Sequence, residues 1–192
     1  MSRILLVALC LVLAGCGAPK GPPRNLDNAC ALAAERPKYM RAMKRTERRW
    51  NVPVHVQMAM IHQESKFDGR ARTPHRYALG IIPMGRLSSA YGYAQAIDGT
   101  WDDYKRATGK RRAKRTDIAD ATDFMGWYMN ETRRRLNIPL GDARNQYLAY
   151  HEGHGGYARG SYRRKSWLLS VADRVDRRAD MYKQQLKSCR RW

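Results

Sequence analysis

The fold is decided by the stretch VHVQMAMIHQES, residues 54–65. Val54, Met58 and Ile61 recur at the spacing i, i+4 and i+7, which places them on one face of a helix. The helix runs to about Glu64, after which a loop begins. The stretch therefore predicts an amphipathic helix that carries a single carboxylate at its C-terminal end.

Helical patterns flank this stretch on both sides. Pro37 suits the first turn of a helix that runs to Trp50. Residues 66–90 contain Gly and Pro at five positions and show no sustained period, so we expect a long loop there. Further helices are expected from a Thr100 cap to Gly109, from a Thr116 cap onward, over residues 145–150, and through Leu168, Val171, Val175, Tyr182 and Leu186. The sequence predicts a mainly α single domain with a long loop after the helix that carries Glu64.

Length and charge narrow the classes of protein. The chain has 192 residues, of which 43% are hydrophobic, enough for one packed domain. With 37 Lys and Arg against 17 Asp and Glu, the net charge is +20. This composition excludes collagen-like, disordered acidic and multi-span membrane proteins. The basicity indicates an anionic partner, which could be nucleic acid, a lipid surface or an acidic polymer.

The first sixteen residues indicate export. Arg3 precedes an apolar run over residues 4–13, and small residues then lead to Cys16. This is the arrangement of a secretory signal, and Leu-Ala-Gly-Cys at its end looks like a lipobox, in which the cysteine becomes lipid-modified. The alternatives are a buried strand or an ordinary signal peptide. We expect a signal peptide over 1–15, a lipid-anchored tether over 16–27 and the folded domain over 28–192.

The same motif predicts a location. Gly17 after Cys16 resembles the pattern of lipoproteins that are passed to the outer membrane. We therefore expect a lipid-anchored protein of a Gram-negative bacterium that faces the periplasm. Export also argues against nucleic acid as the partner.

Two cysteines remain in the folded part. Cys10 leaves with the signal and Cys16 carries lipid, so Cys30 and Cys189 remain near the two ends of the domain. In an oxidising compartment this pair predicts a disulfide that closes almost the whole domain. The alternative is two free, buried thiols. No CxxC motif is present, so a cysteine zinc site is excluded.

Glu64 is the candidate catalytic residue. Its carboxylate meets the negative end of the helix dipole, which favours the protonated form, and partial burial acts in the same direction. A glutamic acid in such a place can serve as a general acid near neutral pH. Taken alone, a glutamate at a helix end is more often simply solvated.

Two later segments strengthen this candidate. Residues 91–95 read Tyr-Gly-Tyr-Ala-Gln, and residues 149–153 read Ala-Tyr-His-Glu-Gly. With Glu64-Ser65, these segments in this order resemble the lytic transglycosylases of the soluble type, a lysozyme-like family whose pieces read Glu-Ser, Gly-Leu-Met-Gln and Ala-Tyr-Asn-Ala-Gly. The resemblance covers roughly residues 50 to 160 and implies a lysozyme-like (goose-type) α domain.

The resemblance assigns roles to individual residues. It implies that Glu64 is the single catalytic acid/base, that Gln95 lines the sugar groove and that Tyr150 orients the catalytic carboxylate. Ser65, Tyr93 and His151 complete the predicted substrate-binding residues.

The sequence also departs from the family pattern. Tyr93-Ala94 stands where Leu-Met is usual, and His151-Glu152 replaces Asn-Ala. The serine often found between the first two motifs has only Ser88 and Ser89 as candidates.

The implied reaction is cleavage of the β-1,4 bond between N-acetylmuramic acid and N-acetylglucosamine in peptidoglycan, with a 1,6-anhydro product, which makes the protein a carbon–oxygen lyase. A hydrolytic muramidase is the first alternative, with Asp68, Asp98 or Asp102 as a second carboxylate. A non-catalytic peptidoglycan-binding lipoprotein is the second. We expect a monomer that needs no cofactor.

Other patterns predict less. Residues 62–64 read H-x-E but lack the P-C-x-x-C segment of the zinc deaminases. His151 and His154 lie three positions apart rather than four, so no metal site is expected. The basic runs 110–115 and 133–135 are either solvated faces or attract the carboxylates of peptidoglycan peptides or anionic lipid.

Overall fold

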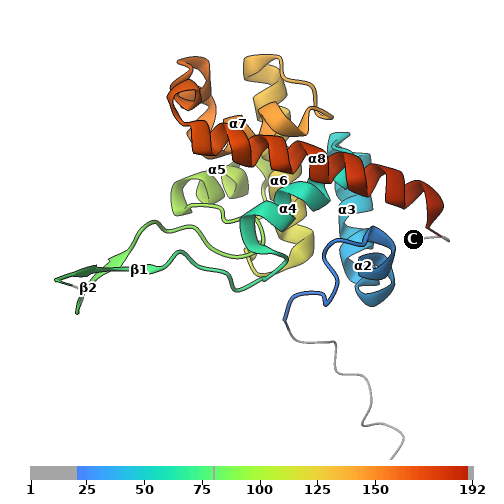
Figure 1. Cartoon of the computed structure of the whole chain (residues 1–192), viewed down its shortest axis with the longest axis horizontal. Helices are drawn as coiled ribbons and strands as arrows, with labels where there is room; N and C mark the ends of the chain where they lie inside the picture. Colours follow the sequence, from blue (N-terminus) through green and yellow to red (C-terminus); the bar gives the residue numbers. More distant parts are fainter. Residues whose placement is uncertain (1–20, 80, 190–192) are drawn as a thin grey trace, which may run out of the picture.

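The computed structural model describes residues 21–79 and 81–189 and is mainly helical, as the sequence predicts (Figure 1). The predicted signal peptide, the predicted lipidation site Cys16 and the first part of the predicted tether lie outside the described residues. The elements are α2 (Ala29–Glu35), α3 (Pro37–Trp50), α4 (Val54–Ser65), β1 (His75–Ala78), β2 (Ile82–Arg86), α5 (Asp98–Thr108), α6 (Ile118–Leu136), α7 (Ala143–Ala158), η1 (Ser161–Arg164) and α8 (Ser166–Ser188).

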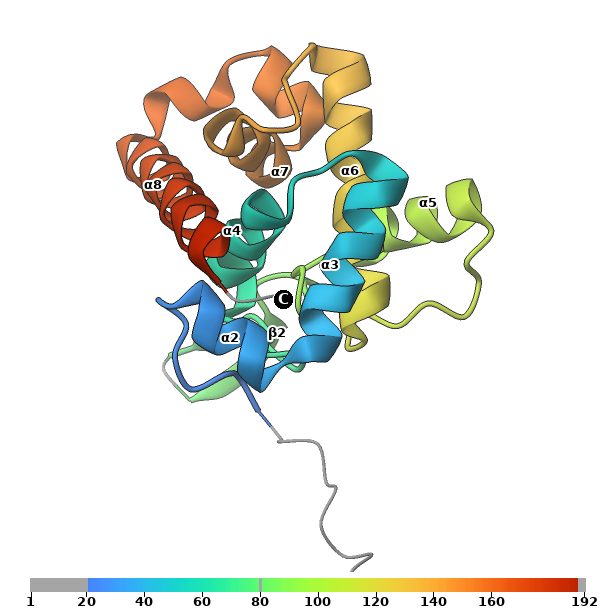
Figure 2. The same cartoon turned by 90° about the vertical axis from the view of Figure 1, so that its right-hand side faces the viewer.

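Helix α4 lies at the centre of the domain. It packs against α3, α6, α7 and α8, and Figure 2 shows α8 and α3 on either side of it. Nine of its twelve residues are buried, including Gln57 and His62. The Gln57 amide donates to the carbonyls of Met43 (3.0 Å) and Val52 (2.8 Å). A helix that is buried nearly all round must carry its apolar residues on every face, so the stripe seen in the sequence is only part of its contact surface.

Helices α3 and α6 form a second packed pair. A Cβ atom at Gly126 would lie 2.5 Å from the Trp50 ring, so the close approach of the two helices requires glycine there. The buried Asp123 carboxylate accepts from Trp50 Nε1 (2.9 Å) and Tyr104 OH (2.7 Å) and pairs with Lys110 (2.9 Å). Burial alone would raise the pKa of Asp123, but these partners lower it below its ordinary value. This network fixes α5 and α6 against α3.

The two ends of the domain are joined covalently. Cys30 in α2 and Cys189 after α8 form a disulfide with a Cα–Cα distance of 5.4 Å. Gln185 of α8 accepts from the backbone N–H of Ala29 (2.7 Å) and donates to the carbonyl of Asp27 (2.9 Å). The predicted pairing of these cysteines is confirmed.

The long loop predicted over residues 66–90 is wrong in part. Strands β1 and β2 form an antiparallel hairpin within it, with His75 opposite Arg86 and Ala78 opposite Ile82. The hairpin extends away from the helices (Figure 1). Its large apolar side chains include several that are more than half exposed: Leu79, Ile81, Met84 and Leu87.

Some predicted helix boundaries are also wrong. Helix α5 begins at Asp98, so Thr100 lies inside it rather than at its cap, although Gly109 does end it in the left-handed conformation. Asp117, not Thr116, caps α6: its carboxylate accepts from the N–H groups of the first turn.

No helix among residues 21–79 and 81–189 is long and apolar enough to cross a membrane.

Candidate active site

The Glu64 side chain lines a cavity of about 560 Å³. The cavity is bounded by the end of α4, the segment between β2 and α5, one face of α6 and the middle of α7. The lining residues are Glu64, Thr73, Ser88, Ala90, Gln95, Ala96, Ile97, Thr100, Phe124, Tyr128, Tyr150, His151, Glu152 and Gly153. The three sequence segments that predicted a site therefore meet around one hollow.

The chain leaves α4 through an unusual turn. Lys66 and Phe67 both have positive φ (52° and 62°), and the N–H of Lys66 donates to the carbonyl of His62 (3.1 Å). Left-handed backbone in two successive non-glycine residues is unfavourable. Complete burial of the Phe67 ring, which stacks on Tyr39 at 6.0 Å, holds the turn in place. The turn stops the helix one residue after Glu64 and leaves that carboxylate at its negative end.

Glu64 holds its proton near neutral pH. Its side chain is partly buried, and burial raises its pKa to about 8. Within the described part of the chain, no cation forms an ion pair with this carboxylate. At pH 7 the protonated form exceeds the ionised form by about ten to one. The group can therefore donate a proton and later accept one.

Tyrosines of α6 and α7 surround Glu64. The pKa of Tyr150 is raised well above its ordinary value by burial and by the charge of Glu64, and Tyr147 responds in the same way. Burial raises the pKa of Tyr128 to about 12. The Tyr128 and Tyr150 rings pack edge to face at 5.0 Å. The part of the cavity wall formed by these tyrosines is thus aromatic and neutral, an environment that disfavours an ionised carboxylate at Glu64.

Gln95 is held in a strained turn. Its φ is +46°, and its side-chain amide donates to the carbonyls of Ala71 (2.9 Å) and Gly92 (2.8 Å). A Cβ atom at Gly92 would lie 2.2 Å from the carbonyl oxygen of Arg115, so glycine is required there. Both amide hydrogens of Gln95 are used to hold the loop, which leaves its side-chain oxygen for a ligand in the cavity.

Tyr150 fastens α7 to this loop. Its hydroxyl donates a hydrogen bond to the carbonyl of Ala94, the residue before Gln95. Tyr150 lines the cavity together with Glu64, and the two titratable groups interact electrostatically. The resemblance implies that Tyr150 orients the Glu64 carboxylate; the hydrogen bond that its hydroxyl donates in the structure goes to the backbone.

Ser65 and Tyr93 lie near the site but do not line the cavity. The Ser65 hydroxyl donates to the carbonyl of Tyr93 (2.8 Å), which joins α4 to the loop. The Tyr93 hydroxyl shares a hydrogen bond with Tyr39 (2.8 Å), and its ring lies against Gly69. These two residues hold α4, α3 and the loop together without lining the cavity.

His151 and Glu152 lie at the opposite rim. Glu152 is 4% exposed and accepts from Lys165 (2.7 Å), from His151 (3.0 Å) and from Ser161. Burial alone would raise the pKa of Glu152, but the hydrogen bonds from Lys165, Ser161 and His151 lower it to about 2. Glu152 is therefore an ionised, fully partnered carboxylate.

A kink follows this pair. Gly153, with φ 70° and ψ 159°, interrupts α7 in a conformation that essentially only glycine adopts. The helical stretch predicted to end in this glycine-rich run instead resumes beyond Gly153 and continues to Ala158. The kink places His151 beside the exposed ring of Trp167, at a centroid distance of 5.3 Å.

Sequence reasoning missed several cavity residues. Phe124 and Tyr128 come from α6, whose pattern indicated only a core-facing helix. Thr73 donates to the carbonyl of Ser88 (2.9 Å), and both line the cavity. Ser89 instead accepts from the N–H of Asp98 and does not line it. Of the two serine candidates, only Ser88 reaches the site.

The carboxylates named for a hydrolytic reaction lie elsewhere. Asp98 pairs with Arg115 (2.6 Å), Asp102 pairs with Lys105 (2.8 Å), and Asp68 lines a separate hollow beside Tyr93. In the described ranges, no cluster of three or more His, Cys, Asp or Glu side chains could hold a metal ion.

Comparison with known proteins gives one family. Residues 4–189 match the family described as Transglycosylase SLT domain, which is nearly the whole chain. No curated protein matches the chain.

Proposed function

Because the chain belongs to the transglycosylase SLT domain family, whose activity is the cleavage of peptidoglycan, we propose that it is a lytic transglycosylase with Glu64 as its single acid/base. The bond cleaved is the β-1,4 bond between N-acetylmuramic acid and N-acetylglucosamine. The observation that carries this proposal is the raised pKa of Glu64 at the edge of a cavity lined by all three motifs.

The reaction uses one carboxylic group twice. Glu64 first donates its proton to the glycosidic oxygen, and the bond from that oxygen to C1 of the muramic acid breaks. The neighbouring N-acetyl group of the substrate stabilises the cationic C1. The ionised Glu64 then removes the proton from the C6 hydroxyl, whose oxygen attacks C1 and closes the 1,6-anhydro ring. No water is consumed, and Glu64 regains its proton.

The neighbours of Glu64 suit this cycle. A neutral aromatic wall keeps the carboxyl protonated before the reaction, and the tyrosines Tyr147 and Tyr150 remain neutral when it ionises. Gln95 offers an acceptor oxygen to sugar hydroxyl or amide groups. His151 and Trp167 offer a polar and an apolar surface at the rim.

A hydrolytic muramidase is the second candidate, and one observation favours it. Glu152 is a second carboxylate at the cavity, which a hydrolase could use to hold a water molecule or to stabilise C1. The Glu152 carboxylate, however, is paired with the Lys165 ammonium at 2.7 Å, which reduces its ability to stabilise C1 or to activate water. This ion pair argues for the transglycosylase reaction.

Digestion of purified sacculi tests both. The wild type should release products with anhydro ends, which lack one water relative to the reducing ends that a hydrolase leaves, and mass spectrometry separates the two. Glu64→Gln should release neither while retaining the helical circular dichroism of the wild type. Release of muropeptides by Glu64→Gln would remove Glu64 from the catalytic role. Binding of sacculi without product from the wild type would favour a non-catalytic binding protein.

We also propose that the protein is a lipoprotein of the outer membrane, anchored through Cys16 and facing the periplasm as a monomer. The lipobox-like end of the N-terminal apolar run supports this, and the Cys30–Cys189 disulfide suits an oxidising compartment.

A further inference from the structure

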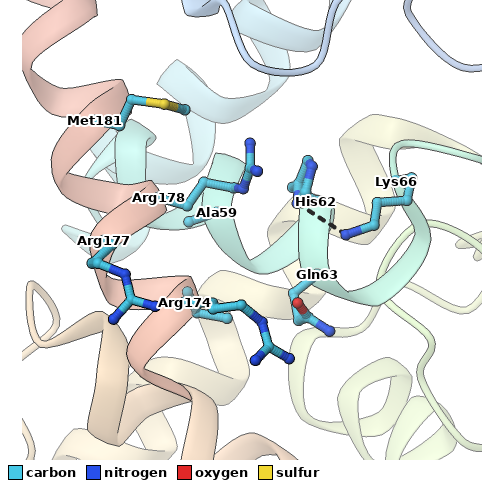
Figure 3. A pocket seen from close by; sticks show the side chains of 9 residues that line it. Ala59, His62, Gln63, Lys66, Arg174, Arg177, Arg178 and Met181 are labelled. Carbon is cyan, nitrogen blue, oxygen red and sulfur yellow. Dashed lines mark hydrogen bonds between the residues drawn. The ribbon is translucent and has the colours of Figure 1, made fainter. Parts of the chain in front are cut away.

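A second hollow lies between α4 and α8. It measures about 370 Å³, and we call it the α4/α8 basic pocket. Figure 3 shows the side chains of Arg174 and Arg178 extending from α8 toward Gln63, His62 and Lys66 of the α4 end. Its lining residues are Ala59, His62, Gln63, Lys66, Arg174, Val175, Arg177, Arg178 and Met181.

Four cations line this pocket, and few acids oppose them. Arg178 pairs with Asp27 at 2.6 Å. Within the ranges that the structure covers, Arg174, Arg177 and Lys66 form no ion pair, and the Lys66 ammonium hydrogen-bonds to the ring of His62 (3.2 Å). The pocket therefore keeps a net positive charge that nothing in the described chain neutralises.

The arginines share one face of α8. Positions 174, 177, 178 and 181 follow the i, i+3, i+4, i+7 spacing, whereas the acids of the same helix at 173, 176 and 180 lie one position earlier and so on a neighbouring face. Asp173, for instance, pairs with Arg144 of α7 at 2.6 Å. The charges of α8 are thus sorted by face, with the basic face toward α4.

The pKa of His62 reflects the burial and the positive charge of this pocket. Burial, together with the charges of Lys66 and Arg178, lowers the pKa of His62 to about 4. The ring is neutral at physiological pH and can accept a hydrogen bond from the Lys66 ammonium. The pocket therefore combines cationic side chains with neutral hydrogen-bonding groups.

The remaining lining residues are apolar. Ala59 and Val175 are buried, and Met181 is half-buried. Met181 therefore supplies the apolar surface that a ligand can reach, and an organic acid with a short aliphatic group would cover it, whereas an inorganic anion would not. The lining thus favours carboxylates carried on a small aliphatic frame.

The pocket and the Glu64 cavity share no lining residue, but both are lined by the C-terminal end of α4. Tyr147 responds to the charges of both Glu64 and Arg174, and the Gln63 side chain hydrogen-bonds to it. Gln63 itself lines the pocket, and Glu64, the next residue, lines the cavity. A substituent on a ligand bound at Glu64 would have to pass Gln63 to reach the basic pocket.

We propose that the α4/α8 basic pocket binds the carboxylates of the short peptide attached to the muramic acid whose bond is cleaved. This inference rests on the proposed function, because it assigns a peptidoglycan peptide to a site beside the glycan-cleaving group. Arg174 and Arg177 hold the carboxylates by charge-assisted hydrogen bonds, and Met181 contacts an aliphatic side chain of the peptide. The protein would then prefer glycan that still carries its peptides.

Two substrates test the preference: intact sacculi and peptide-free glycan prepared from them with an amidase. The test variant is Arg174→Gln with Arg177→Gln, both exposed positions where glutamine is also a good helix former. We expect its cleavage rate to fall about tenfold on sacculi, the loss of two charge-assisted contacts, and to stay unchanged on peptide-free glycan. Equal loss on both substrates, or no loss on either, would overturn the proposal.

The matched control is Arg41→Gln with Arg45→Gln. These are two exposed helical arginines of α3 that lie outside the pocket, and the same charge is removed. The control should retain the wild-type ratio of rates on the two substrates. A parallel change in the control would show that net charge, and not the pocket, sets the preference.

A binding measurement separates this inference from the proposed function. The free peptide released by the amidase is titrated into wild type and into the Arg174→Gln, Arg177→Gln variant by calorimetry, with inorganic phosphate as a second probe. We expect about tenfold weaker peptide binding by the variant and much weaker binding of phosphate by the wild type. Phosphate binding as tight as peptide binding would overturn the assignment. A wild type that binds peptide through these arginines but cleaves neither substrate would refute the transglycosylase and leave the pocket's ligand standing.

Discussion

The hydroxyl of Tyr150 is bonded to the backbone carbonyl of Ala94, so the first segment of α7 and the turn that presents Gln95 move as one unit. The same tyrosine lines the cavity with Glu64 and interacts with it electrostatically. One side chain thus couples the position of a ligand-binding loop to the surroundings of the acid.

Tyr150→Phe tests this coupling. Loss of a buried hydrogen bond should lower the free energy of unfolding by about 1–2 kcal/mol, and the loosened Gln95 turn should lower the cleavage rate about tenfold. The basic limb of the pH–rate profile should not move, because burial raises the pKa of Glu64 and the substitution leaves that burial in place. The matched control is Tyr128→Phe, whose hydroxyl donates to the carbonyl of Ala149 (3.2 Å) and not to the loop. A shifted basic limb in Tyr150→Phe would mean that the hydroxyl acts on Glu64 directly.

The raised pKa of Glu64 predicts an upper pH limit for cleavage and a greater stability of the Glu64→Gln variant. Cleavage should decline as the pH rises through about 8, where Glu64 loses its proton. The folded state binds that proton more tightly than the unfolded state, so stability falls between the ordinary pKa of 4.5 and about 8. Glu64→Gln removes this loss of stability, so we expect its free energy of unfolding at pH 7 to exceed that of the wild type by about 2 kcal/mol. This value is reduced to allow for the partial exposure of the side chain. Equal stabilities of the two proteins at pH 7 in urea titrations would contradict the raised pKa.

Removal of the ammonium beside Glu152 should destabilise the domain. Lys165→Met leaves a buried carboxylate with only Ser161 and His151 as donors, and we expect a loss of about 2 kcal/mol at pH 7. The lowered pKa of Glu152 gives stability that is present above 4.5 and is lost as the pH falls toward 2, so the difference should shrink at pH 3. Arg164→Met, a neighbouring exposed position, is the control and should change little. A pH-independent loss would point to packing instead of charge.

The disulfide should contribute strongly to stability. It closes a span of 159 positions, for which the loop-entropy model gives about 5 kcal/mol. Replacing Cys30 and Cys189 by Ala should lower the midpoint of urea unfolding without changing the helical content of the folded protein. The reducing agent dithiothreitol should have the same effect on the wild type and none on the variant. A variant as stable as the wild type would show that the α2–α8 contacts suffice.

The lipid anchor can be tested in cells of a Gram-negative host. Cys16→Ser should abolish labelling with a fatty-acid analogue and release the protein from the membrane fraction, while Cys10→Ser should do neither. Labelling that persists in Cys16→Ser would refute the lipobox.

The helices were largely predictable because their periods are local. The starts and ends of α3 and α4 agree with the expected ones, and the apolar residues named for α8, from Leu168 to Leu186, are all buried. Boundaries failed where two polar residues compete for one cap, as at Thr116 and Asp117.

The hairpin could not be predicted from its pattern. Gly80, Pro83 and Gly85 interrupt any alternation of polar and apolar residues between 75 and 86. Its strands are paired by the backbone and pack little against the core, so they leave no signal of burial in the sequence.

The site was predictable only in its motifs. Glu64, Gln95 and Tyr150 stand in recognisable segments, and all three line the cavity. Phe124 and Tyr128 resemble core residues because their rings do pack against neighbours, and only the folded chain shows that they also form a wall. Ser65 and Tyr93 belong to the motifs, yet their hydrogen bonds go to other residues of the framework and neither side chain lines the cavity. Spacing in the sequence cannot reveal this.

The bond between Cys30 and Cys189 also makes the folded chain a closed ring in the covalent sense. A protease that cut once in the protruding β1–β2 hairpin would not separate the two fragments, because the ring would merely open at a new point. The domain could therefore tolerate a nick at its most exposed segment and still keep both walls of the cavity on one molecule. Only a second cut, or reduction of the sulfur bridge, would leave the halves free to part.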